Sequence, residues 1–385
     1  MKHADIISKL NLEQKCALLS GETVFTTRGY KNAGIPSITL SDGPNGVRKQ
    51  AGAADHLGLN PSVPATCFPT AATVACSWDP ALGEQLGQAM GEEAAAQEVS
   101  VLLGPGLNTK RSPLCGRDFE YFSEDPILAG KMAAAYVRGI QKKGIAACPK
   151  HFAVNSQELR RMASNSVVDE RTLRELYLTG FEIVVKEARP KTIMTSYNLI
   201  NGTYANENAH LLQDILRKDW GFDGAVVTDW GGSNDHALGV KNGSTLEMPC
   251  PGGDSIRELM KAVKDGKVTE ADLDARLDEL LELVLTNDLH QQVFRLQQPW
   301  NEKYQYGWLF GLVVGWIVIC ILLAFGIIAH KSRNPRILRR LPLPAIPLVL
   351  LGIYAVLYGF HFPLIKQFLG DMTIVHCLMT AASLE

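Results

Sequence analysis

Short apolar segments alternate with amphipathic segments along residues 1–285. The short segments are rich in aliphatic and β-branched residues, which suit buried β-strands. They predict strands at residues 35–41, 99–104, 144–150, 192–198 and 225–229, with a weaker candidate at 244–249.

The segments between these strands carry helix-start signals. In Asp79-Pro80 and Asp125-Pro126 a capping carboxylate precedes a proline at the first helical position. Residues 169–186 open with acidic residues and close with a basic one, as a helix dipole favours. Strands separated by whole helices need crossover connections, so we expect a parallel sheet. The repeated unit predicts an α/β fold, a (β/α)8 TIM-type barrel. The alternative, an open dinucleotide-binding sheet, is not favoured because its G-x-G-x-x-G fingerprint does not follow the first strand.

The pattern changes after residue 285. Residues 286–306 are polar and predict a linker, and residues 307–328 form an uncharged run of 22 residues. As a helix, this run is long enough to cross the ~30 Å hydrocarbon core of a bilayer. Residues 329–341 are then expected to form a basic loop and residues 342–365 a second transmembrane helix.

Residues 366–385 resemble the start of a third, incomplete span. We therefore expect two or more transmembrane helices, a multi-pass location and the lipid bilayer as a partner. The five Lys and Arg residues of 330–340 favour a cytoplasmic loop, which would place the barrel outside. The N-terminus shows no apolar core of a secretory signal to carry the barrel there. The side of the membrane on which the barrel lies therefore stays open.

Composition narrows the function classes. The formal net charge is −2, which gives no electrostatic reason to expect nucleic acid as a partner. The eight cysteines form no C-x-x-C pair, and none lies at metal-ligand spacing from a histidine. We therefore expect reduced thiols, no metal and no cofactor.

Polar side chains follow four of the predicted strands at the barrel end where chemistry is expected. These are Asp42, the pair Lys150 and His151, Tyr197, and Asp229. A single aspartate at a strand end commonly caps the next helix. Several such groups together favour one shared site, because each would otherwise need its own partner to offset desolvation.

Two connecting segments and one strand end add to this set. Arg117 and Arg161 offer guanidinium groups suited to vicinal hydroxyls, and Trp230 offers an apolar wall for a sugar ring. Cations near Asp229 would keep its carboxylate ionised at a dry strand edge. The alternatives to a role in the site are purely structural: His151 would be a packed core histidine, and one of the two adjacent arginines at 160–161 would be a solvated surface charge.

Seven motifs occur in one order along residues 5–285: SDGPNGVR, GRDFEYFSEDP, KHF, IMTSYN, NGTYANEN, LRKDWGFDGAVVTDW and LEMP. Together they resemble the N-terminal barrel of glycoside hydrolase family 3, of the β-glucosidase type. The resemblance implies an enzyme of carbohydrate metabolism that hydrolyses O-glycosyl bonds by a retaining mechanism. Its substrate would be a β-glucoside or a related oligosaccharide.

The resemblance also assigns residues. Asp229 matches the catalytic nucleophile. The positions that match the substrate-binding pocket are Asp42, Arg48, Arg117, Lys150, His151, Arg161, Met194, Tyr197 and Trp230. For Met194, core packing with incidental substrate contact is the competing interpretation.

The family pattern is broken at the acid/base. In the β-glucosidase branch this glutamate lies on a second α/β domain after the barrel, and another branch carries its acid/base on a KHFPGHG-like loop. Here the loop reads KHFAVNSQE, and the predicted membrane segments follow the barrel. We therefore expect the acid/base to be absent from this chain and to come from a second chain or domain, or the enzyme to be incomplete. The alternative is a membrane-anchored carbohydrate-binding or sensing module without turnover, and the tail could equally be a natural fusion, a truncation or a gene-prediction artefact.

Overall fold

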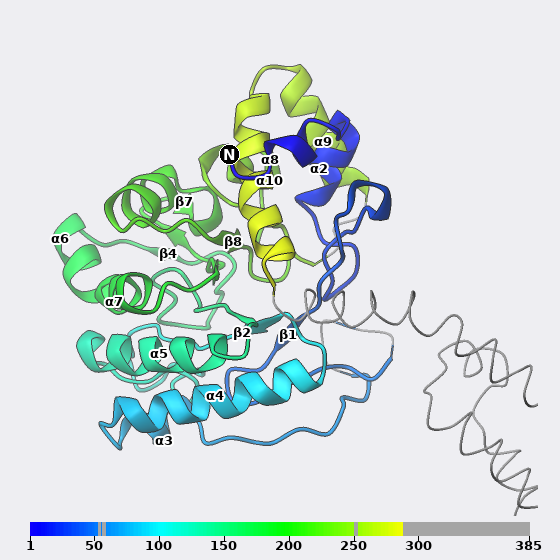
Figure 1. The fold of residues 1–385 in the computed structure, drawn as a ribbon. Helices are drawn as coiled ribbons and strands as arrows, with labels where there is room; N and C mark the ends of the chain where they lie inside the picture. The colour runs from blue at the N-terminus through cyan, green and yellow to red at the C-terminus, as the bar shows by residue number, and fades with distance from the viewer. Residues whose placement is uncertain (53–54, 56–58, 250–252, 288–385) are drawn as a thin grey trace, which may run out of the picture. The chain divides into compact units, whose positions relative to one another are not determined.

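Short parallel strands form the centre of the fold (Figure 1). The computed structural model describes residues 1–52, 55, 59–249 and 253–287. In one sheet β1 (Leu40–Asp42), β2 (Val101–Leu103) and β3 (Ala146–Ala147) pair in parallel, and in another β5 (Thr192–Met194) pairs in parallel with β8 (Ala225–Val227). Every residue of β2, β3, β5 and β8 is buried, as expected for strands covered on both faces. The strands predicted at these positions are confirmed, in shorter form.

Single backbone bridges join the sheets into a ring. A parallel bridge from Phe152 to Thr195 links β3 to β5, and one from Val227 to Leu246 extends the ring past β8. The weak strand predicted at 244–249 is thus reduced to a bridged segment.

The last wall of the ring differs from the expected barrel. Ser20 pairs in parallel with Glu247, but the chain then reverses, and Thr26 pairs antiparallel with Thr39 just before β1. Only residues 21–25 lie between Ser20 and Thr26, so no helix separates the two extended segments. Within the described residues, the regular (β/α)8 repeat is therefore interrupted in this wall.

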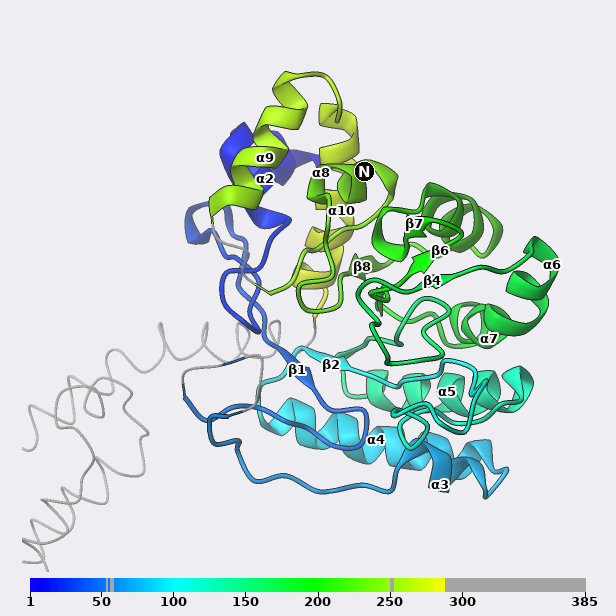
Figure 2. The same cartoon turned by 180° about the vertical axis from the view of Figure 1, so that it is seen from behind.

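The predicted helix starts are confirmed. The Asp79 side chain accepts a hydrogen bond at the start of α4 (Pro80–Ala96), and Asp125 does the same for α5 (Pro126–Gln141). The helix predicted at 169–186 is divided into α6 (Glu170–Thr172), a π-helical segment η2 (Leu173–Tyr177) and α7 (Thr179–Ala188). The helices α4, α5 and α7 pack beside one another on the outside of the sheet (Figures 1 and 2).

The remaining elements are connections and a second group of helices. They are α1 (Ala4–Ile7), α2 (Leu12–Leu18), η1 (Lys31–Ala33), α3 (Ala71–Ala75), β4 (Asn165–Ser166), β6 (Leu199–Ile200), β7 (Thr203–Tyr204), η3 (Ala205–Glu207), η4 (His210–Asp219), α8 (His236–Asn242), α9 (Gly253–Lys264) and α10 (Glu270–Leu285).

The first two helices, α1 and α2, contact the last described helix, α10. Buried Lys15 of α2 donates to Asp274 of α10 at 2.6 Å, and the backbone N–H of His3 donates to Asp278 at 2.8 Å. After α10, the buried Asn287 side chain donates to the carbonyl of Ser100 at 3.0 Å. Because Ser100 immediately precedes β2, the described chain ends at the amino ends of the strands.

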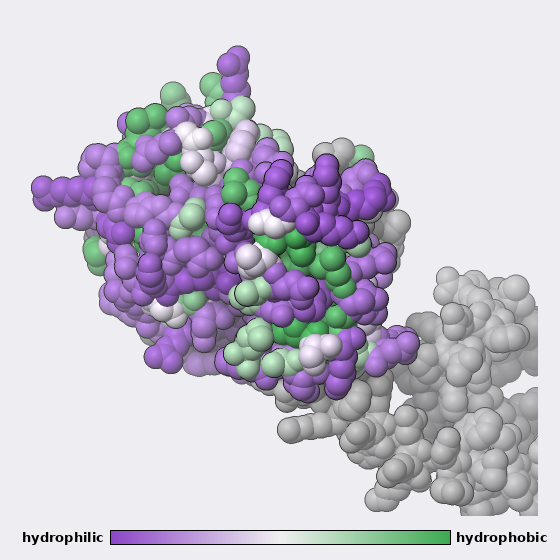
Figure 3. Space-filling view, turned by 90° about the horizontal axis from the view of Figure 1, so that it is seen from above, coloured by the Kyte–Doolittle hydropathy of each residue, from purple (hydrophilic) through white to green (hydrophobic). Residues whose placement is uncertain are grey.

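Apolar side chains concentrate in two buried clusters. Neighbouring strand residues face opposite sides, so Ile193 belongs to one cluster and Met194 to the other. The face of the molecule in Figure 3 is mainly hydrophilic, with hydrophobic residues in separate patches.

The predicted linker and transmembrane helices at 286–385 lie almost entirely outside the described residues. Within the part of the chain that the structure describes, no helix is long and apolar enough to span a bilayer. The predicted domain boundaries therefore stay predictions.

Helix α4 approaches α5 through glycines, and this predicts the effect of a single methyl group. A Cβ on Gly87 would overlap the backbone of Tyr136, and one on Gly91 would overlap the backbone of Ile140. We expect Gly87→Ala to lower the free energy of unfolding by about 2 kcal/mol, despite a gain of up to about 1 kcal/mol in helix propensity. Urea unfolding measures the change. Gln85→Ala, at an exposed position of the same helix, is the control, and equal stability of the two variants would contradict the close approach.

Candidate active site

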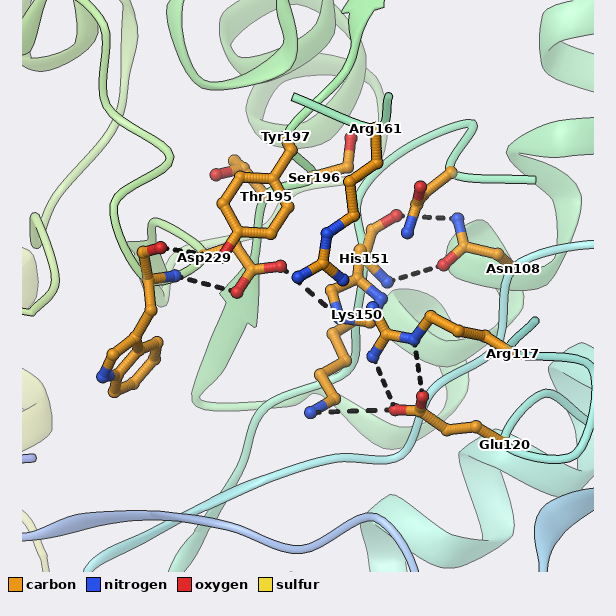
Figure 4. Close-up of polar contacts among 12 residues, drawn as sticks. Asn108, Arg117, Glu120, Lys150, His151, Arg161, Thr195, Ser196, Tyr197 and Asp229 are labelled. Atoms are coloured by element: carbon orange, nitrogen blue, oxygen red, sulfur yellow. Dashed lines mark hydrogen bonds and ion pairs between the residues drawn. The ribbon is translucent and has the colours of Figure 1, made fainter. Parts of the chain in front are cut away.

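Most of the predicted site residues meet at the carboxyl ends of the parallel strands. Lys150 and His151 follow β3, Tyr197 follows β5 and Asp229 follows β8, and Figure 4 shows these side chains converging. Asp42, the last residue of β1, joins them through Lys150. Parallel strands present their carboxyl ends at one edge, so the common location predicted from the sequence follows from the topology.

Asp229 lies at the centre of this group. Its side chain is 13% exposed, and its Oδ2 lies 3.6 Å from Nε2 of His151. Its Oδ1 accepts a hydrogen bond from the backbone N–H of Trp230 at 2.8 Å. Burial raises the pKa of Asp229 above its ordinary value, while Lys150, the Trp230 N–H and Arg117 lower it. The cations therefore offset the effect of burial on the pKa of Asp229 only in part.

Lys150 is buried in a network of opposite charges. Its Nζ donates to Oδ1 of Asp42 at 2.9 Å and lies 3.8 Å from Oε1 of Glu120. Burial lowers the pKa of Lys150, but Asp42 and Glu120 outweigh it, and the pKa lies above its ordinary value. Burial likewise raises the pKa of Asp42, but Lys150 holds it below the ordinary value. Both groups are therefore charged at neutral pH.

Arg117 is held from two sides. Its Nε and Nη2 donate to the two oxygens of Glu120 at 2.7 and 3.0 Å, and its Nη1 lies 3.7 Å from Oε1 of Glu158. Such a bidentate pair fixes the plane of the guanidinium. Glu158 also accepts from Nη1 of Arg161 at 2.8 Å, so one carboxylate aligns both arginines.

Aromatic residues form one side of the site. The guanidinium carbon of Arg161 lies 4.7 Å from the ring centre of Tyr197, whose hydroxyl donates to the carbonyl of Trp230 at 2.7 Å. The Trp230 indole donates to the carbonyl of Val24 at 2.7 Å and packs against Phe25, with 5.4 Å between ring centres. The predicted apolar wall at Trp230 is thereby fixed in place.

His151 is both a buried histidine and a neighbour of Asp229. Its backbone N–H donates to Asn108, and the Asn108 amide donates back to the His151 carbonyl, at 2.7 and 2.8 Å. Burial, followed by the charges of Arg117, Lys150 and Arg161, holds the imidazole pKa well below its ordinary value. The imidazole is therefore neutral.

Two predicted residues do not join this cluster. Met194 is buried in a hydrophobic cluster, which favours the packing interpretation. Arg48 is exposed, and its backbone N–H donates to the carbonyl of Asp42 at 2.9 Å. With Phe25 and Ser41 it lines a hollow of about 370 Å³.

The sequence interpretation missed four residues of the site: Asn108, Glu120, Tyr121 and Glu158. Both glutamates lay inside segments already singled out, three positions from their arginines, in the pattern R-x-x-E at 117–120 and E-x-x-R at 158–161. That spacing was the available signal. Among the described residues, no group of three His, Cys, Asp or Glu side chains could hold a metal ion.

Comparison with known proteins shows the family to which the chain belongs. Residues 52–283 match the glycosyl hydrolase family 3 N terminal domain. The chain belongs to glycoside hydrolase family 3. It is 50% identical over 279 residues to thermostable beta-glucosidase B of Acetivibrio thermocellus, covering 72% of this chain and 37% of that relative. It is 46% identical over 279 residues to an exo-alpha-(1->6)-L-arabinopyranosidase of Bifidobacterium longum, again covering 72% and 37%.

Solved structures of family 3 enzymes have the same fold. Beta-glucosidase 3B from Thermotoga neapolitana, in complex with alpha-D-glucose, matches with a TM-score of 0.70 and 38% identity, over 74% of this chain and 43% of that one. The matched region of the chain spans only 37% of the length of thermostable beta-glucosidase B of Acetivibrio thermocellus.

The histidine pKa directions predict a loss of stability in acid. The pKa values of His151 and His236 are lowered, by burial above all. Below about pH 6.5 the unfolded chain binds protons that the folded chain does not, so stability falls as the pH falls. Each histidine contributes up to about 1.4 kcal/mol between pH 6.5 and 5.5.

We expect His151→Gln to reduce the stability difference between pH 7.5 and 5.5 by up to about that amount, measured by urea unfolding at both values. The raised pKa of Asp229 acts in the opposite direction. An equal loss in the variant and the unaltered protein would show that His151 binds protons equally in the folded and the unfolded chain, which would contradict its lowered pKa.

Proposed function

We propose that this chain is the barrel part of a retaining β-glycosidase of the β-glucosidase type, with Asp229 as the nucleophile. The observation that carries the proposal is the position of Asp229: a largely buried carboxylate at the end of β8, facing His151 and surrounded by cationic side chains. Relatives named as beta-glucosidases support the choice of substrate.

The site residues divide the task. Lys150, Arg117 and Arg161 present charged donors, and Asp42 presents a charged acceptor, for the hydroxyls of one sugar unit. Trp230 offers its ring to the apolar face of that unit. In the first step, Asp229 attacks the anomeric carbon and forms a glycosyl ester as the leaving oxygen departs; in the second, water replaces Asp229.

A second carboxyl is needed about 5–5.5 Å from the nucleophile to protonate the leaving oxygen and activate water. The carboxylates beside the site are already engaged: Asp42 by Lys150, Glu120 by Arg117, and Glu158 by Arg161. We propose that the acid/base comes from a second chain or domain. A β-glucoside or related oligosaccharide and this second carboxyl-bearing part are thus the expected partners.

Because the proposed acid/base lies outside this chain, only some substrates are expected to react with the chain alone. A glycoside with an acidic phenol leaves without protonation, whereas an alkyl glycoside does not. We expect a dinitrophenyl 2-fluoro-glucoside to modify Asp229 covalently, and the adduct to persist because no base activates water.

The measurement is the intact mass followed by peptide mapping. Asp229→Asn should abolish the adduct, and Asp254→Asn, at an exposed aspartate, should retain it. No adduct on the full chain, or an adduct on another residue, would refute the nucleophile assignment. Sugar binding without any adduct would favour the alternative of a carbohydrate-binding or sensing module.

We also propose a multi-pass membrane location, supported by the uncharged run at 307–328. The full chain should sediment with membranes and require detergent for extraction, as measured by ultracentrifugation of lysates. A variant with two lysines introduced near the middle of the run, at Val318 and Leu322, should be held less tightly by the membrane, because each charge costs roughly 3 kcal/mol in a bilayer. A monodisperse full chain in the high-speed supernatant would refute the proposal.

A further inference from the structure

His151 presents a different partner to each of its ring nitrogens. Its Nδ1 lies 3.1 Å from the hydroxyl of Tyr121, and its Nε2 lies 3.6 Å from Oδ2 of Asp229. A neutral imidazole carries one N–H, so the tautomer decides whether Asp229 faces a hydrogen or a lone pair.

The donor and the acceptor of each hydrogen bond near His151 can be assigned by starting from Glu158. Oxygens of Glu158 face the guanidinium groups of Arg161 and Arg117, so this carboxylate acts as an acceptor. The amide nitrogen of Asn155 lies 3.3 Å from Oε1 of Glu158. Since the carboxylate accepts, the nitrogen and not the oxygen of this amide must face it.

The same amide nitrogen of Asn155 lies 3.2 Å from the hydroxyl oxygen of Tyr121. Asn155 therefore donates one hydrogen to Glu158 and the other to Tyr121. The Tyr121 oxygen is thus an acceptor toward Asn155, and its own single hydrogen is directed to Nδ1 of His151. Tyr121 and Asn155 are buried, at 0% and 1% exposure, so bulk water does not compete for these bonds.

We infer that Glu158, Asn155 and Tyr121 form a relay that fixes His151 as the Nε2–H tautomer, with its N–H directed at Asp229. Tyr121 and Asn155 are positioning residues, because they act on Asp229 only through His151. In the other tautomer the Nε2 lone pair would face the carboxylate and repel it. The consequence for attack by Asp229 rests on the proposed glycosidase function, whereas the tautomer itself does not.

The charges around His151 are consistent with a neutral ring. Arg117, Lys150 and Arg161 oppose its protonation, and Asp229 is the carboxylate that faces Nε2. The pKa of Tyr121 lies well above its ordinary value, chiefly because the hydroxyl is buried. Tyr121 therefore keeps the hydrogen that it donates.

The direct test is the nitrogen spectrum of the histidine rings in the full chain, labelled with ¹⁵N-histidine near pH 7. Protonated and unprotonated ring nitrogens have well-separated shifts, and the signals of His151 are those lost in His151→Gln. We expect a protonated Nε2 and an unprotonated Nδ1. A protonated Nδ1 in the unaltered protein would overturn the relay, and this measurement depends on no variant of Tyr121.

Tyr121→Phe should then release the tautomer and populate Nδ1–H. Tyr136→Phe is the matched control, because the Tyr136 hydroxyl is also buried but has no hydrogen-bond partner among the described residues. An unchanged Nε2–H signal in Tyr121→Phe would overturn the proposal.

The functional readout is the rate constant for modification by the dinitrophenyl 2-fluoro-glucoside. We expect Tyr121→Phe to lower the maximal rate about ten-fold, the worth of one oriented hydrogen bond, with little change in the concentration giving half the maximal rate. An unchanged maximal rate would refute the positioning role. No modification of the unaltered protein, together with the Nε2–H tautomer, would refute the glycosidase proposal and leave the relay standing.

Discussion

The pairing of buried charges is the constraint on which the site depends. Lys150 is 4% exposed, and a bare ammonium at such a position would be costly. Asp42 and Glu120 compensate it, and Glu120 and Glu158 in turn align Arg117 and Arg161. Three carboxylates therefore hold three cations in place before any ligand arrives.

Asp229 stands apart from this arrangement. Among the described residues, its side chain accepts from a backbone N–H and faces the neutral ring of His151 and the hydroxyl of Tyr197, and no lysine or arginine nitrogen forms an ion pair with it. The cations act on it from farther away and offset part of the rise in its pKa that burial causes, without occupying its oxygens. A carboxylate that is neither neutralised by contact nor fully solvated keeps its lone pairs available for reaction.

The sequence was informative where the strand pattern alone determines the position of a residue. Lys150, Tyr197 and Asp229 could be located because each follows an apolar run whose carboxyl end has a fixed place in a parallel sheet. The capped starts of α4 and α5 were predictable because Asp-Pro is a local signal.

Other features depend on contacts that are distant in sequence. The roles of Glu120 and Tyr121 are set by loop conformations that bring them to Lys150 and His151, and periodicity does not encode these. The antiparallel pairing before β1 was missed because the segment at 20–27 is too short to give a strand pattern. The π-helical segment η2 has no sequence signal that distinguishes it from an ordinary helix.

The hydrogen bond from Asn287 to Ser100 has a consequence for how such a unit is combined with others. It fixes the exit of the chain at the amino ends of the strands, on the opposite side from the carboxyl ends that carry Asp229. A segment fused after residue 287 therefore starts on the opposite side of the strands from Asp229.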